Sequence, residues 1–260
     1  MKREREKKEK EELEKQRILL KQIKECEEKL KFEQEQRAHL IELKKKEIEK
    51  KENFEYTLDE RLLDTPAFAM ERCRTITSSM ALKTGEIIGM SLKQIENYSN
   101  ERYEQIKKME DEIDKYEDYI SAFLVKLSSK NISNNDSKTM SIILHSINDF
   151  ERMSDHAFNI NRIMKDMSKK KLVFSDYAKK DLKVMCSALT DITTRTVNIF
   201  IREDESAART IEPLEEIIDK LNKEAKQKHI IRLREGKCTI ELGLLLEDLI
   251  TNIERISDHC

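Results

Sequence analysis

The chain has 260 residues, enough for one or two domains, and 39% of them are charged, against about 25% in ordinary globular proteins. Four glycines, two prolines and no tryptophan leave few helix breakers, so the composition favours long helices with large solvated faces. A net charge of −2 gives no overall attraction to nucleic acid, and no apolar run approaches the ~18 residues that span a bilayer. The five cysteines form no CxxC pair, so we expect reduced cytosolic thiols.

Residues 1–56 are predicted to form a charged helical stalk or a weak coiled coil. Four aliphatic residues share one heptad position: Leu13, Leu20, Ile41 and Ile48. Two polar residues, Glu27 and Gln34, interrupt that seam, so helical charge pairs rather than burial would support this segment. A role as a specific docking stalk stays open.

Residues 57–260 are expected to be all-α, with two tandem antiparallel three-helix units packed around a pseudo-twofold axis. Six helices are predicted, at about 65–97, 100–130, 137–167, 175–202, 205–234 and 238–260. Pro66 marks the first helix start, and Gly236 suits a left-handed C-cap after the fifth helix. Pro213 would either kink the fifth helix or set a later start. Repeat 1 then covers about 65–167 and repeat 2 about 175–260.

An internal repeat supports this division. The sequence Glu-Arg-(Met/Ile)-Ser-Asp-His begins at Glu151 and again at Glu254, an offset of 103 residues. Upstream, Asp114 and Asp219 occupy similar segments with an offset of 105 residues.

Each copy of the repeat places two carboxylates one helical turn apart, beside the apolar stripe of its helix. The pairs are Glu151 with Asp155 and Glu254 with Asp258, and Asp114 and Asp219 on the adjacent helices could join them. Such oxygen-only groups suit hard or borderline cations. The alternative is a duplicated packing motif in which Arg152 and Arg255 neutralise the acids.

His156 and His259 fall on the other flank of the stripe. They are therefore poor co-ligands, and we expect them to make surface or interhelix hydrogen bonds.

These residues resemble the PhoU family, whose three-helix repeat carries an acid-x-x-x-Asp motif in its third helix. Residues 57–67 resemble the segment that opens the cytoplasmic PhoU-like region of bacterial Na⁺/phosphate cotransporters of the NptA type. The resemblance implies a six-helix fold, metal ions (Fe, Mn, Mg or Zn) at the six acids named above, and a role in phosphate uptake or its control. Asp149 matches a frequent family acid, but the second copy has Asn252 there.

The resemblance also implies a location and partners. We expect a non-enzymatic regulatory domain at the cytoplasmic face of the cell membrane, beside a membrane phosphate transporter or its own missing membrane domain. The chain could also form a homo-oligomer in this role, whereas we do not expect nucleic acid as a partner. The sixth helix is expected to continue beyond Cys260, so repeat 2 would be truncated at its C-terminus.

Three alternative functions remain at this point. One is a free-standing PhoU-type phosphate-signalling regulator, and another is a metal-free helical adaptor. The third, a di-metal oxidase, is disfavoured because that chemistry needs Glu-x-x-His pairs, and no histidine of the chain has a glutamate three residues before it.

Overall fold

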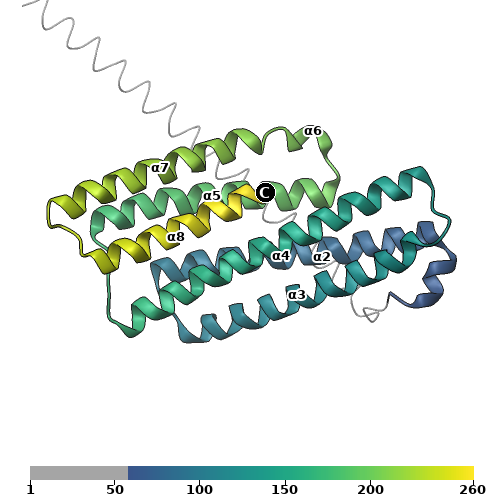
Figure 1. Cartoon of the computed structure of the whole chain (residues 1–260), viewed down its shortest axis with the longest axis horizontal. Coiled ribbons are helices and arrows are strands. Elements are labelled where there is room, and N and C mark those ends of the chain that lie inside the picture. Colours follow the sequence, from purple (N-terminus) through teal and green to yellow (C-terminus); the bar gives the residue numbers. More distant parts are fainter. Residues whose placement is uncertain (1–57) are drawn as a thin grey trace, which may run out of the picture. The chain divides into compact units, whose positions relative to one another are not determined.

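The computed structural model describes residues 58–260, and the predicted stalk (residues 1–56) lies outside this range. Over the described residues every regular element is helical, as the sequence predicted (Figure 1). The elements are η1 (Glu60–Asp64), α2 (Pro66–Glu96), α3 (Asn100–Ser128), α4 (Asn134–Lys169), α5 (Asp176–Arg202), α6 (Glu205–Ala208), α7 (Glu212–Arg234) and α8 (Ile240–Asp258).

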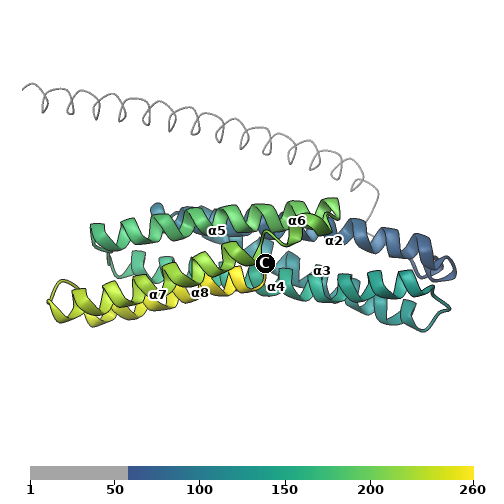
Figure 2. The same ribbon diagram turned by 90° about the horizontal axis from the view of Figure 1, so that it is seen from above.

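The long helices form two antiparallel three-helix units. Helices α2, α3 and α4 pack together as the first unit, and α5, α7 and α8 as the second. Between the units, α2 packs against α5 and α4 against α8, so equivalent helices of the two repeats meet each other. Figures 1 and 2 show the units side by side along the length of the bundle. The predicted architecture is therefore confirmed.

Local signals set the helix ends. The Ser133 and Ser175 side chains accept hydrogen bonds from the N–H groups of Asp136 and Ala178, as expected of N-caps. Gly236 has a φ of 69°, the left-handed conformation predicted after the fifth helix. That helix starts later than its predicted position of about 205, because a short α6 and a turn precede α7, in whose first turn Pro213 lies.

The apolar stripe of α4 is buried as the sequence predicted. Its members are Ile143, Ile147, Phe150, Ala157, Ile160 and Met164. Phe150 also meets Phe200 of α5 edge-on, with ring centroids 5.1 Å apart, so the core is continuous between the two units. No helix within residues 58–260 is long and apolar enough to cross a membrane.

Candidate functional site: two unequal acidic clusters

The first acidic cluster lies between α3 and α4. Glu110 and Asp114 are one turn apart on α3, and Asp155 approaches them from α4. One carboxylate oxygen of each residue lies within 4.8 Å of the others. A metal ion could be shared by three or more acidic, histidine or cysteine side chains that lie this close together. Within residues 58–260, the three acids of the first cluster meet this condition. Oxygen donors of this kind fit Mg²⁺ or Mn²⁺.

Repulsion within the first cluster outweighs the effect of the nearby cations Lys107 and Arg152. Burial and the neighbouring carboxylates, chiefly Asp114, raise the pKa of Glu110 to about 7. Burial, followed by Asp155 and Asp114, likewise raises the pKa of Glu151 to about 7. Burial and Asp155 also raise the pKa of Asp114. Within the described chain none of these four carboxylates forms an ion pair, so a proton or a bound cation would relieve their repulsion.

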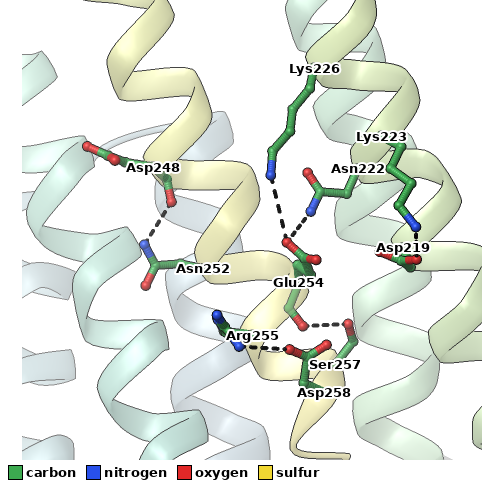
Figure 3. Close-up of polar contacts among 10 residues, drawn as sticks. All are labelled: Asp219, Asn222, Lys223, Lys226, Asp248, Asn252, Glu254, Arg255, Ser257 and Asp258. Carbon is green, nitrogen blue, oxygen red and sulfur yellow. Dashed lines mark hydrogen bonds and ion pairs between the residues drawn. The ribbon is translucent and has the colours of Figure 1, made fainter.

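The second cluster, between α7 and α8, contains its own cations (Figure 3). The Lys223 Nζ lies 2.5 Å from the Asp219 carboxylate, and the Lys226 Nζ lies 3.9 Å from that of Glu254. The side chain of Asn222 donates a hydrogen bond to Glu254 as well. Arg255 pairs with Asp258 on the outer side, at 3.4 Å. The acids of the second half are thus directed toward cationic or amide groups of the protein itself.

Three substitutions between the repeats account for this difference. At the repeat offset of 105 residues, Asn222, Lys223 and Lys226 occupy the places of Glu117, Asp118 and Ser121. The second copy therefore replaces two acids and a serine by an amide and two lysines. Arg152 and Arg255 are common to both copies, but among the described residues Arg255 pairs with Asp258 whereas Arg152 forms no ion pair.

The structure groups the predicted residues unevenly. It brings Asp114 and Asp155 together and places Glu151 close enough for these two to raise its pKa. It adds Glu110, which the sequence reasoning missed, although Glu110 and Glu215 share the offset of 105 residues and could have been found by it.

The other three predicted ligands, Asp219, Glu254 and Asp258, lie in the second half. Glu215 joins them there, since burial and then Asp258 and Asp219 raise its pKa. Among the described residues, however, the second half presents no group of converging acids like that of the first.

The two histidines of the motif lie where α4 crosses α8. The Nδ1 atom of His156 lies 2.9 Å from the Asn252 side-chain oxygen, and that of His259 lies 3.1 Å from the Asp149 carboxylate. The two rings stack, with centroids 6.0 Å apart. The expectation of interhelix hydrogen bonds is confirmed, and the residue pairs are equivalent under the repeat.

A family model described as the PhoU domain matches residues 77–164 and 182–260, one segment in each three-helix unit. The chain belongs to the PhoU family. Each matched segment contains one copy of the acidic motif, so the two clusters are the equivalent parts of two PhoU repeats.

A curated relative supports the family at the level of sequence. The phosphate-specific transport system accessory protein PhoU homolog 1 of Thermotoga maritima is 29% identical over 117 residues, 45% of this chain. The match spans about half the length of that relative, 50%.

Solved structures support the fold. PhoU from Pseudomonas aeruginosa superposes with a TM-score of 0.68 at 19% identity, over 73% of this chain and 90% of its own. The phosphate transport system regulatory protein PhoU from Streptococcus pneumoniae gives a TM-score of 0.66 at 18% identity, over 75% and 90% of the two chains. Both share the helical bundle of the PhoU domain.

Proposed function

We propose that the chain is a non-enzymatic, PhoU-type regulator of phosphate uptake whose first repeat binds a divalent cation. The regulatory part is supported by two matched PhoU segments and by the description of the Thermotoga maritima relative as a phosphate-transport accessory protein. The metal part rests on one observation, the convergence of Glu110, Asp114 and Asp155 with no ion pair to any of them among the described residues.

A cation would lower the repulsion within the first cluster and so stabilise the folded chain. Glu110, Asp114 and Asp155 would hold the ion, and Glu151, whose pKa Asp155 and Asp114 raise, would be a further donor. The second cluster is proposed to bind a cation more weakly, because Lys223 and Lys226 already lie beside its carboxylates.

Thermal unfolding with and without Mn²⁺, after treatment with a chelator, tests the metal part. A ligand that binds only the folded state raises the apparent stability, by about 2.7 kcal/mol at a concentration of 100 times Kd. We expect Asp155→Asn to abolish most of this shift and the matched variant Asp258→Asn to retain it. An unchanged melting temperature in wild type would instead favour a metal-free helical adaptor.

Two settings fit the regulatory role. The chain is either a free-standing PhoU protein or the PhoU-like part of a Na⁺/phosphate cotransporter system at the cytoplasmic face of the membrane. The cotransporter setting is supported by the resemblance of residues 57–67 to the opening segment of those proteins, and the free-standing setting by the PhoU relatives. An upstream reading frame that encodes membrane helices would favour the cotransporter setting, whereas a phosphate-import operon would favour a free-standing regulator.

Uptake of radiolabelled phosphate tests the role itself. The chain would be expressed in bacteria that lack their own PhoU, and the initial uptake rate would be compared with that of cells carrying an empty vector. We expect the chain to change the uptake rate, and Asp155→Asn to weaken that change if the cation is required. Unchanged uptake at equal expression would contradict the regulatory proposal.

A further inference from the structure

One end of the bundle is rich in lysine. The α4–α5 and α7–α8 connections both lie there, at the left in Figure 1. Ion pairs join the helices that flank these connections: Lys170 Nζ lies 2.7 Å from Glu241, and Arg232 lies 3.0 Å from Asp181. We call this region, residues 165–183 and 228–241, the basic end.

The positive charge of the basic end is only partly neutralised. Residues 165–183 contain seven lysines and three aspartates, whereas the whole chain has a net charge of −2. Asp181 is shared between Lys228 and Arg232, and Asp176 pairs with Lys179. Four exposed lysines of this segment have no ion-pair partner among the described residues: Lys169, Lys171, Lys180 and Lys183.

Large apolar side chains project between these lysines. Val173, Tyr177 and Ile240 are 64%, 68% and 71% exposed. Tyr177 lies close enough to Lys237 of the α7–α8 connection to interact with it electrostatically, and Ile240 begins α8 directly after that connection. A basic surface with exposed aliphatic and aromatic side chains has the composition of a protein face that binds at the water–bilayer interface.

A cavity of about 570 Å³ opens at the same end. Its walls include Met164, Met167, Phe174 and Leu182, and lysines 171, 179 and 183 also line it. Three lysines against the single carboxylate of Glu96, beside apolar walls, match a ligand with an apolar body and an anionic head.

We propose that the basic end docks on an anionic phospholipid bilayer. The ammonium groups of Lys169, Lys171, Lys180 and Lys183 contact lipid phosphates, while Val173 and Tyr177 enter the headgroup region. Nucleic acid fits this surface less well, because the cations without an ion pair are mostly lysines, with Arg234 beside them, and the large exposed side chains are mainly aliphatic. The docking surface uses none of the acidic-cluster residues, so it goes beyond the proposed regulatory function.

Co-sedimentation of the full chain with vesicles tests the proposal. We expect binding to phosphatidylcholine vesicles that contain phosphatidylglycerol and little binding to phosphatidylcholine alone. The double variant Lys171→Gln/Lys180→Gln should bind roughly tenfold more weakly or worse, since each lysine near an anionic surface contributes about 1 kcal/mol. Raising the salt from about 0.1 M to about 1 M should weaken wild-type binding as well.

The matched control is Lys108→Gln/Lys138→Gln, which removes the same charge from exposed positions outside the basic end. This control should bind as wild type does, and Val173→Ser/Tyr177→Ser should bind more weakly at both salt concentrations. Equal binding to neutral vesicles, equal loss in both lysine variants, or preference for an RNA oligonucleotide over the anionic vesicles would overturn the proposal. None of these outcomes depends on a bound metal or on phosphate uptake, so they are independent of the proposed function.

Discussion

Two carboxyl groups of the first cluster, those of Glu110 and Glu151, should make the stability of the metal-free chain depend on pH. Their pKa values in the folded protein are raised from 4.5 to about 7, so between these values the folded state binds more protons than the unfolded chain. The free energy of unfolding should therefore rise as the pH falls from about 8 to about 5. Urea denaturation with chelator present, at several pH values, measures this slope.

The double variant Glu110→Gln/Glu151→Gln is the control for this prediction. It removes the two raised pKa values together with their charges, so the slope should flatten and the stability above pH 7 should increase. A wild-type slope that survives in the double variant would assign the pH dependence to other groups.

The lysines of the second cluster define another prediction at this scale. Replacing Lys223 by Asp and Lys226 by Ser gives the second repeat the residues found at the equivalent positions of the first. The acids then lose the ammonium groups that lie 2.5 and 3.9 Å away, and a cation should take their place. Equilibrium dialysis against Mn²⁺ should show more metal bound per chain, by up to one equivalent.

Lys220→Asp serves as the matched control for the lysine replacement. Lys220 also lies on α7, but its ion-pair partner is Glu216 rather than a cluster acid. This variant should leave the metal content unchanged. An increase in Lys220→Asp equal to that in the double variant would point to general surface charge instead of the cluster.

At the scale of the helices, the buried apolar stripe of α4 should contribute strongly to stability. Ile147 is buried in the core, whereas Ile142, five residues earlier on the same helix, is 58% exposed. Ile147→Ala should lower the free energy of unfolding by about 2–5 kcal/mol through lost burial and a cavity. Ile142→Ala should change it by no more than about 0.5 kcal/mol. Denaturant titration of both variants measures the free energy of unfolding for the same substitution at a buried and an exposed position of one helix. Equal losses of stability would mean that the buried stripe is assigned incorrectly.

The helices were predictable because their signals are local. The stripe of α4 follows the period of a helix, and Ser175 and Gly236 mark helix ends through their own conformational preferences. The start of the fifth helix could not be decided from the sequence, since Pro213 is compatible either with a kink inside the helix or with its first turn.

The unequal chemistry of the two clusters was less accessible from the sequence. The pair Asp219–Lys223 has the spacing of an i,i+4 ion pair and could have been read directly. The approach of Lys226 to Glu254 joins two helices, and it depends on the rotation of α7 against α8 that only packing determines. Aligning the two repeats would still have revealed both lysines, because Lys223 and Lys226 stand where the first repeat has Asp118 and Ser121.

At the scale of the whole molecule, the two repeats make equivalent contacts where α4 crosses α8, as a pseudo-twofold relation requires. His259 Nδ1 lies 3.1 Å from the Asp149 carboxylate, and the equivalent His156 Nδ1 lies 2.9 Å from the Asn252 amide oxygen. In both contacts the ring N–H can donate to a side-chain oxygen, so an amide and a carboxylate serve the same purpose at equivalent positions.

Asp149→Asn should therefore be tolerated, with a change of no more than about 0.5 kcal/mol in the free energy of unfolding, because the acceptor oxygen is retained. Asp149→Leu should lower it by about 1 kcal/mol, since the half-buried imidazole loses its partner between the units. A double-mutant cycle with His259→Leu, measured in urea, should give a coupling energy of about 0.5–1.5 kcal/mol. Strict additivity in that cycle would mean that the His259–Asp149 contact contributes contact area but no directional bond between the two units.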